Sequence, residues 1–356
     1  MISVRIRKRY PPARESAGFV LDVEFQSIAG ITVLFGPSGS GKTLTLDSIA
    51  GFVRPDEGRI LLEDSILFDG AAKIHLPPQA RRCGYVFQNY ALFPHMTIRE
   101  NLAFAADRIP RLERHRRVNE MLERFRLTEF AGRRPHEVSG GQKQRCSIAR
   151  ALIVEPRVLL LDEPATGLDA PLRQELYSIL RQVRQEFKIP ILMVTHDLDE
   201  CFALGDEMLI LRMGKIVQSG LPARVVEQPA NADVAKLLGI YNLLPVEIRA
   251  LDPGRNSSRY RYGNHELAGP YFPGRLLGDR VLLCVRPDQL RAVAREDVRP
   301  MNAIPARLMR VEERHSSVRL EFSDNVTVDM PREEFERQKH TKEWMIQFPI
   351  SGVRVL

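Results

Sequence analysis

Residues 36–43 read Gly-Pro-Ser-Gly-Ser-Gly-Lys-Thr, the Gly-x-x-x-x-Gly-Lys-Thr pattern of a phosphate-binding loop. The apolar residues 30–35 before this octet predict a buried strand, and residues 44–50 after it have the periodicity of a helix. Glycines let backbone N–H groups turn inward toward phosphate oxygens, and the following helix adds the positive end of its dipole. The strand–loop–helix context therefore predicts an α/β fold with a nucleotide site at the end of the strand.

The octet also predicts how a nucleotide and its metal ion are held. The Lys42 ammonium group can reach the β- and γ-phosphates, and the Thr43 hydroxyl can ligate Mg²⁺. We therefore expect ATP and Mg²⁺ as cofactors. The residues expected to contact the nucleotide here are Gly36, Pro37, Ser38, Gly39, Ser40, Gly41, Lys42 and Thr43.

A pair of carboxylates follows a second apolar run. Residues 158–161 read Val-Leu-Leu-Leu, the pattern of a central parallel strand covered on both faces, and Asp162 and Glu163 come next. Ligands of open α/β sheets bind at the carboxyl ends of the strands. We expect Asp162 to hold Mg²⁺, directly or through water, and Glu163 to act as general base for an attacking water.

Four further stretches carry a resemblance to a known family. They are Gln88 within Tyr85-Val-Phe-Gln-Asn-Tyr, then Val138-Ser-Gly-Gly-Gln, Ala165-Thr-Gly-Leu-Asp-Ala and Val194-Thr-His-Asp. In this order they resemble the Q-loop, the signature motif, the D-loop and the switch histidine of the ABC (ATP-binding cassette) ATPases. Val138 stands where that family usually has leucine. The resemblance implies an ATP hydrolase with a mixed-sheet core and a helical subdomain.

The resemblance also implies that two cassettes share each active site. In a Ser-Gly-Gly-Gln turn that opens a helix, hydroxyl and backbone N–H groups form a second anion cradle, which in the family closes over the γ-phosphate bound by another cassette. The chain has one phosphate loop and one signature, so we expect a homodimer or a pair with a separate cassette chain. An ordinary helix N-cap is a second, compatible role for Ser139. The implied residues are Ser139, Gly140, Gly141 and Gln142 toward the partner's nucleotide, Gln88 at the catalytic and metal site, His196 at the γ-phosphate in cis, and Asp169 between the two sites.

The aromatic residue that stacks on adenine in this family has two candidates. Tyr10, within Arg7-Lys-Arg-Tyr, fits the family position, and Phe19 is the alternative. Residues 11–16, Pro-Pro-Ala-Arg-Glu-Ser, have the composition of a small inserted loop.

Length and composition set further bounds. At 356 residues the chain exceeds one typical domain. No apolar run reaches the roughly 18 residues that span a bilayer, and no secretory signal opens the chain, so we expect a soluble, cytosolic protein. The cysteines are scattered without a Cys-x-x-Cys pair, which disfavours zinc and disulfides; they are Cys83, Cys146, Cys201 and Cys284.

The net charge of +7 raises the question of a nucleic-acid partner. The densest basic run, residues 108–117, lies between the Q-loop and the signature, and no aromatic residues interleave with its arginines, which disfavours single-stranded nucleic acid. A solvated helix face is the simplest interpretation. Contact with anionic lipid head groups or with loops of a membrane partner is the alternative, and we expect no nucleic acid.

The chain changes character near residues 227–233. Downstream, short runs of alternating apolar and polar residues predict a small all-β, OB-like barrel. Examples of these runs are residues 280–286, 304–311, 317–322 and 326–330. We place the boundary near residue 235, which gives a nucleotide-binding domain over residues 1–235 and a barrel domain over residues 236–356.

The second domain resembles regulatory modules of importer ATPases. Cys284-Val-Arg-Pro-Asp-Gln-Leu resembles a stretch of the TOBE domains. The part from Asn302 onward resembles a single molybdate-binding-type (Mop) module, but the usual Ser-Ala-Arg-Asn opening is not matched beyond Asn302. We assign no ligand residues to this domain.

A cassette followed by such a barrel resembles the ATPase subunits of bacterial binding-protein-dependent importers. The resemblance implies ATP hydrolysis that powers import through a membrane permease at the cytoplasmic face of the cell membrane, with an extracytoplasmic substrate-binding protein as a further partner. Gln88 and residues 89–96 are the expected permease contact. Residues 29–36 and 81–95 look most like the molybdate branch; sulfate, polyamine, iron or sugar import are the alternatives, and a soluble ABC ATPase or an oxyanion sensor would be functions of another class.

Overall fold

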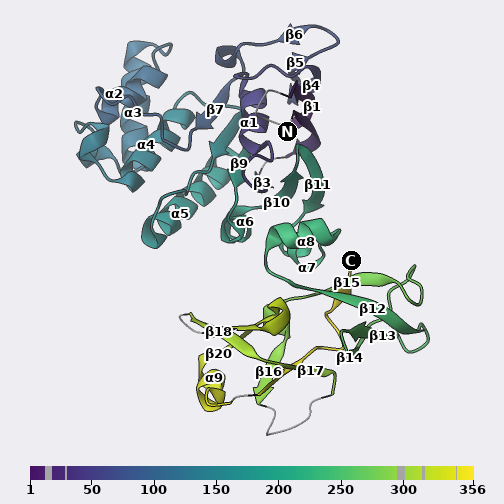
Figure 1. The fold of residues 1–356 in the computed structure, drawn as a ribbon. Helices are drawn as coiled ribbons and strands as arrows, with labels where there is room; N and C mark the ends of the chain where they lie inside the picture. The colour runs from purple at the N-terminus through teal and green to yellow at the C-terminus, as the bar shows by residue number, and fades with distance from the viewer. Residues whose placement is uncertain (13–17, 29, 295–300, 315–316, 342) are drawn as a thin grey trace. The chain divides into compact units, whose positions relative to one another are not determined.

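The structure, a computed structural model, describes residues 1–12, 18–28, 30–294, 301–314, 317–341 and 343–356 (Figure 1). The described chain divides into two compact units, Met1–Gln228 and Pro229–Leu356. The boundary expected near residue 235 falls inside helix α8 (Ala232–Leu238), which lies in the second unit. Within the expected small insertion, residues 13–16 lie outside the described residues.

The first unit is built around a six-stranded sheet. In spatial order its strands are β11 (Lys215–Gly220), β10 (Glu207–Arg212), β3 (Gly30–Phe35), β9 (Pro190–Thr195), β8 (Val158–Asp162) and β7 (Cys83–Val86). Neighbouring strands run parallel except for β11, which pairs antiparallel with β10 at one edge. Every residue of β3, β8 and β9 is buried, because helices or the second sheet cover both faces, and this explains their continuous apolar sequence.

A second sheet of the first unit is antiparallel. In spatial order its strands are β2 (Phe19–Ser27), β1 (Ile2–Tyr10), β4 (Glu57–Leu62), β5 (Ser65–Asp69) and β6 (Ile74–His75). Helix α1 (Lys42–Ala50) follows the octet directly. One apolar cluster joins Val4 of β1, Leu46 and Ile49 of α1, and Leu34 of β3. The helix that begins at the phosphate loop is therefore packed against both sheets.

Three helices between Gln88 and the paired carboxylates form a group of their own, which is the helical subdomain that the sequence predicted (Figure 1). They are α2 (Ile98–Ala105), α3 (Arg111–Arg124) and α4 (Gly140–Leu152), and α2 packs against both others. Besides α1, the described part of this unit also has the α-helices α5 (Ala170–Phe187), α6 (Leu198–Leu204) and α7 (Pro222–Glu227). Across the described ranges, no helix is both long and apolar enough to cross a membrane.

The second unit is rich in strands, as predicted, and its described strands form three antiparallel sheets around one apolar core that includes Tyr260, Phe322 and Trp344. The first sheet has β14 (His265–Gly269), β13 (Ser257–Tyr262), β12 (Asn242–Asp252), β15 (Arg280–Val285) and β22 (Arg354–Val355). The second has β16 (Arg291–Ala294), β21 (Trp344–Gln347) and β17 (Ala303–Ala306), and the third has β18 (Leu308–Glu313), β19 (Ser317–Phe322) and β20 (Thr327–Pro331). Helices α8 and α9 (Arg332–Gln338) complete the unit.

One predicted strand of the second unit is two strands in the structure. The run 304–311 is divided between β17 and β18, which belong to different sheets. At the junction the backbone of Arg307 bonds Ser323, since its N–H donates to Ser323 Oγ and its carbonyl accepts from Ser323 N. Continuous alternation in the sequence did not reveal this switch, because both halves keep an alternating pattern.

Candidate active site

The octet forms a tight loop between β3 and α1. Gly41, the N-cap residue of α1, has φ +104°, a left-handed conformation that residues with side chains rarely adopt. At Gly36 an added Cβ would lie 2.2 Å from the Leu211 carbonyl oxygen. Glycine is therefore required at these two positions, for conformation at Gly41 and for close approach at Gly36.

Lys42 points back into this loop and is only 6% exposed. Its Nζ donates to the carbonyl oxygens of Gly36 at 2.8 Å and Pro37 at 3.0 Å. Burial lowers the pKa of the ammonium group, while the carboxylates of Glu163 and Asp162 act in the opposite direction. The Ser40 hydroxyl is also buried and finds no hydrogen-bond partner among the described residues. A cation and an unpaired hydroxyl in one glycine-bearing loop fit the phosphates of a nucleotide.

Thr43 and Asp162 meet across the sheet. The Thr43 hydroxyl, at the first turn of α1, donates to Asp162 Oδ1 at 3.0 Å, at the carboxyl end of β8. Burial raises the pKa of Asp162, and the Thr43 hydrogen bond partly opposes that shift. No described group of three or more His, Cys, Asp or Glu residues could hold a metal ion by itself. Magnesium commonly uses one or two protein oxygens together with waters and substrate phosphates, so a hydroxyl–carboxylate pair fits it.

Glu163, Gln88 and His196 converge beside that pair. Gln88 Nε2 donates to Glu163 Oε2 at 3.3 Å, and His196 Nδ1 lies 3.4 Å from Glu163 Oε1. The three residues follow β7, β8 and β9, whose carboxyl ends meet at one edge of the sheet. The His196 side chain is 60% exposed, so it is not a buried histidine of the hydrophobic core. Sequence separation hides this convergence, but the strand-end position of each residue anticipates it.

The signature turn is held by hydrogen bonds at the start of its own helix. Ser139 is the N-cap of α4, where its hydroxyl accepts from Gln142 N and Gln142 Oε1 accepts from Ser139 N. Asp169 likewise caps α5 by accepting from Leu172 N at 3.0 Å. Among the described residues, no hydrogen bond or ion pair links residues 139–142 to residues 36–43. The ordinary cap role of Ser139 is thus present in the isolated chain.

The two candidate base-stacking aromatics are cross-strand partners. Tyr10 of β1 lies opposite Phe19 of β2, so both rings project from one face of the ribbon. Tyr10 is 41% exposed, with the Lys8 ammonium 5.7 Å from its ring centre. The Phe19 ring reaches to 3.1 Å from the position that a Gly41 Cβ would occupy. Phe19 therefore lies against the phosphate loop, whereas the more exposed Tyr10 lies near the Lys8 ammonium.

Thr166 belongs to the same cluster, although no sequence motif predicted a role for it. Its hydroxyl donates to Glu163 Oε2 at 3.1 Å. The only available signal was its position three residues after Glu163 in a stretch that contains proline and glycine, where turns bring such residues together.

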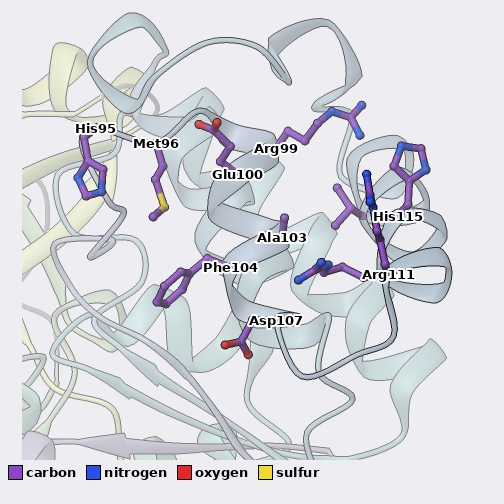
Figure 2. A pocket seen from close by; sticks show the side chains of 11 residues that line it. His95, Met96, Arg99, Glu100, Ala103, Phe104, Asp107, Arg111 and His115 are labelled. Atoms are coloured by element: carbon purple, nitrogen blue, oxygen red, sulfur yellow. The ribbon is translucent and has the colours of Figure 1, made fainter.

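A pocket of about 710 Å³ opens between α2 and α3 (Figure 2). It combines residues from the expected permease-contact loop with residues from the basic run. Figure 2 shows Met96 and Phe104 toward one end and Arg111 and His115 toward the other. The full lining is His95, Met96, Arg99, Glu100, Ala103, Phe104, Asp107, Arg111, Arg114, His115 and Val118.

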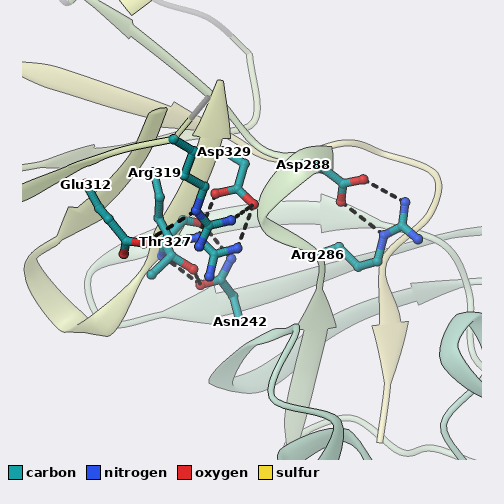
Figure 3. A network of polar contacts seen from close by, with 8 residues as sticks. Asn242, Arg286, Asp288, Glu312, Arg319, Thr327 and Asp329 are labelled. Carbon is teal, nitrogen blue, oxygen red and sulfur yellow. Dashed lines mark hydrogen bonds and ion pairs between the residues drawn. The ribbon is translucent and has the colours of Figure 1, made fainter. Parts of the chain in front are cut away.

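The second unit carries a polar network whose groups satisfy one another (Figure 3). The Asn242 amide exchanges hydrogen bonds with the backbone of Thr327, and Arg319 forms a two-pronged pair with Asp329 at 2.7 and 2.6 Å. Asn302, at the start of the Mop-like stretch, uses its amide to bond the backbones of Ala268 and Phe348. These side chains therefore link neighbouring segments of the second unit. Arg319 already has the carboxylate of Asp329 as its partner.

The chain is similar to a known protein family and to import ATP-binding proteins. Residues 22–166 match the ABC transporter family model. The molybdenum import ATP-binding protein ModC of Rhodospirillum rubrum is 42% identical over 222 residues, which cover 62% of this chain and 60% of that protein. The spermidine/putrescine import ATP-binding protein PotA of Nitratidesulfovibrio vulgaris is 40% identical over 300 residues, which cover 82% of this chain and 77% of that protein.

A solved structure extends the comparison to the fold. It is an ATP-binding cassette in a dimeric, post-hydrolysis state bound to ADP and Pi. The two chains are 27% identical and superpose with a TM-score of 0.54 over 62% of this chain and 99% of the cassette. The P-loop ATPase fold predicted for the first unit is therefore confirmed.

Proposed function

The chain belongs to the ABC transporter family, and on that premise we propose that it hydrolyses ATP to power molybdate import through a membrane permease. The observation that carries this proposal is the convergence of Gln88, Glu163 and His196 beside the Thr43–Asp162 pair. It brings together the partly buried carboxylate of Glu163, the Thr43–Asp162 pair that fits a metal ion, and the phosphate loop. Together these groups suit phosphoryl transfer to water.

Each residue of the site has a role that its surroundings support. Lys42, Ser40 and the backbone N–H groups of residues 36–43 would hold the phosphates, and Thr43 with Asp162 would hold Mg²⁺, with Gln88 as a further ligand. Bound Mg·ATP supplies an electrophilic γ-phosphate and a charge that neutralises the one developing on it. Tyr10 and Phe19 would flank the adenine ring, with Phe19 nearer the loop.

Glu163 is the general base in this proposal. Its side chain is 18% exposed, so it is shielded yet reachable by water. It would take a proton from the attacking water, while His196, held 3.4 Å from Oε1, would donate to the γ-phosphate side. Gln88 contacts the other carboxylate oxygen and connects this cluster to residues 89–96.

The complete site needs a second copy of the chain. We place residues 139–142 of the partner, at the N-terminus of α4, over the γ-phosphate, where N–H groups and the helix dipole favour negative charge. Asp169, at the cap of α5, would transmit the state of one site to the other. The dimeric state of the related solved cassette supports a homodimer.

The pocket between α2 and α3 is the proposed binding site for a cytoplasmic segment of the permease. Its lining has the apolar side chains of Met96 and Phe104 toward one end and Arg111 and His115 toward the other. Arg150 of α4 donates to the carbonyl oxygens of Tyr90 and Ala91, so the loop between Gln88 and the pocket is tied to the helix that begins with the signature. An occupant of the pocket could therefore influence both halves of the nucleotide site. Such docking would hold the chain at the cytoplasmic face of the membrane as a peripheral subunit, and the second unit would regulate the assembly as TOBE-type domains do.

Molybdate is the proposed cargo because the ModC relative is 42% identical and because residues 29–36 and 81–95 resemble the molybdate branch. Polyamine is the second candidate, because the PotA relative matches a larger share of this chain and extends into the second unit. Uptake of labelled molybdate and labelled spermidine, measured in cells that carry the wild-type chain or Glu163→Gln, separates them. Molybdate uptake that disappears in the variant supports the proposal, whereas loss of spermidine uptake alone transfers it to polyamines.

A further inference from the structure

Two side chains donate to the same oxygen of Glu163. Thr166 Oγ1 lies 3.1 Å from Glu163 Oε2, and Gln88 Nε2 lies 3.3 Å from that atom. The other oxygen, Oε1, faces His196 Nδ1 at 3.4 Å. The two oxygens of the carboxylate are thus in different surroundings. Oε2 accepts two hydrogen bonds, whereas Oε1 accepts neither of them and faces His196.

The backbone around this carboxylate is set independently of its side chain. Glu163 has φ +46°, a left-handed conformation that is uncommon for a residue with a side chain, and its N–H donates to the Val194 carbonyl at 3.0 Å. Thr166 N donates to the Glu163 carbonyl at 3.2 Å and closes a turn. These bonds fix where the Glu163 side chain starts but not where its flexible carboxylate points.

We propose that Thr166 is a positioning residue for the general base: its hydroxyl holds Oε2 so that Oε1 is presented to the water. This inference rests on the proposed role of Glu163. Gln88 is also a proposed Mg²⁺ ligand through its amide oxygen, and taking up that role would reorient its amide, whereas Thr166 has no second proposed partner and would remain the donor to Oε2. The hydroxyl contributes orientation, and no bond is made or broken at Thr166.

Thr166 also lies in the loop that leads to Asp169, the cap of α5. A hydroxyl fixed to this loop makes the orientation of the carboxylate depend on the position of residues 165–169. When a second copy closes against that loop, the base is aligned at the same time. Orientation of this kind acts on the rate of the chemical step and leaves nucleotide affinity unchanged, because the Thr166 hydroxyl and N–H both bond Glu163 and neither bonds the phosphate loop in the described chain.

The test compares Thr166→Val, which keeps the shape and removes the hydroxyl, with Thr166→Ser, which keeps the hydroxyl. We expect kcat to fall about tenfold in T166V, since a hydrogen bond to a charged group contributes about this factor, with KM and ATP affinity unchanged. T166S should retain kcat within about twofold of wild type. A T166V enzyme with wild-type kcat, an equal loss in T166S, or a raised KM would each overturn the proposal.

A readout without nucleotide tests the same contact. The side-chain carboxyl ¹³C resonance of Glu163, assigned by its absence in Glu163→Gln, should shift in T166V and stay in place in T166S. An unchanged resonance in T166V would show that the hydroxyl does not hold the carboxylate.

A double-mutant cycle separates this inference from the proposal it rests on. If Glu163 is the base, T166V should cause no further loss of turnover in the Glu163→Gln background, because the group it orients is gone. Wild-type turnover in Glu163→Gln alone would refute the role of the base itself. An inactive Glu163→Gln combined with a fully active T166V would refute only the positioning role.

Discussion

The Tyr85 hydroxyl donates to Asp47 Oδ1 at 3.0 Å and so joins the edge strand β7 to α1, the helix that begins at the phosphate loop. Burial raises the pKa of the Asp47 carboxyl, and the Tyr85 hydrogen bond opposes this shift. The Tyr85 ring stacks on Phe87 at 4.3 Å, one residue before Gln88. A single hydrogen bond therefore connects the start of the Q-loop with the helix behind the nucleotide site.

Removing that bond should weaken the first unit without abolishing nucleotide binding. We expect Tyr85→Phe to lower the free energy of unfolding by about 1–2 kcal/mol, because a partly buried carboxyl loses its partner. Chemical denaturation followed by circular dichroism measures the loss. The double variant Tyr85→Phe/Asp47→Asn should lose less than the sum of the two single variants, since the amide is easier to bury than the carboxylate; strict additivity would contradict a direct coupling.

Arg81 provides the second stability test, because the residue is 1% exposed and its guanidinium bonds the C-terminal end of α1. It donates to the carbonyl oxygens of Ser48, Ile49 and Leu76 at 2.8 Å each. Arg81→Met should cost about 2–4 kcal/mol of unfolding free energy, since buried carbonyls lose a charged donor. Arg81→Lys keeps the charge but cannot span the three oxygens, so we expect an intermediate loss. Equal melting temperatures of Arg81→Met and wild type would show that water replaces the guanidinium.

The sequence predicted the elements of the first unit that depend on local constraints. Gly36 and Gly41 are dictated by close approach and backbone conformation, and the apolar run before Asp162 is dictated by burial on both faces. Since parallel strands end at one edge, the meeting of Gln88, Glu163 and His196 could also be expected. The sequence could not predict contacts made by hydroxyl groups with several possible partners, such as Thr166 with Glu163 or Tyr85 with Asp47.

In the second unit, the alternation of apolar and polar residues predicts strands but not how they are arranged in sheets. Alternation predicts strands in residues 304–311 but does not say that the chain changes sheets at Arg307. The boundary expected near residue 235 lies within α8, whereas the second unit already begins at Pro229 and contains the whole helix. Composition changes mark a transition between units, but contacts made after folding decide on which side a helix lies.

The buried position of Asp162 predicts how Mg²⁺ dependence changes with pH. Burial raises its pKa, and Mg²⁺ binds the charged form, so acidification should weaken Mg²⁺-dependent nucleotide binding at a higher pH than for an exposed aspartate. Affinity for a non-hydrolysable ATP analogue with Mg²⁺, measured from about pH 5 to pH 8, should rise with pH. Asp162→Asn should bind more weakly and lose most of this slope. An equal slope in the variant would assign the proton to another group.

For stability of the nucleotide-free chain the sign of the same shift is opposite. A carboxyl with a raised pKa binds its proton more tightly in the folded state, so its contribution to stability is greatest at low pH and declines as pH rises through the folded pKa. Asp162→Asn removes the cost of burying the charge. We therefore expect the nucleotide-free variant to be more stable than wild type at neutral pH, with the difference shrinking on acidification in denaturation experiments.

The pocket between α2 and α3 is tested by two phenylalanines of equal exposure. Phe104 lines the pocket and is 51% exposed, whereas Phe202 lies on α6 and is 50% exposed. Phe104→Ala should reduce co-purification with the membrane permease about tenfold or more, because aromatic anchors dominate interface energy. Phe202→Ala should leave it unchanged, and both variants should keep basal ATP hydrolysis. Equal behaviour of the two variants would exclude this pocket as the binding site for the permease.

The proposed shared active site predicts that blocked hydrolysis traps a dimer. Variants of Ser139 separate its role as a helix cap from its proposed contact with the partner's nucleotide. Glu163→Gln should bind ATP and change from monomer to dimer on size-exclusion chromatography when Mg·ATP is added. In that background Ser139→Asn and Ser139→Asp both keep a good N-cap for α4. Only the aspartate places a negative charge where the partner's γ-phosphate is expected, so we expect ATP-dependent dimers with Ser139→Asn and monomers with Ser139→Asp. Dimers in both would show that Ser139 serves only as a helix cap, and no dimer in Glu163→Gln itself would count against the sandwich arrangement.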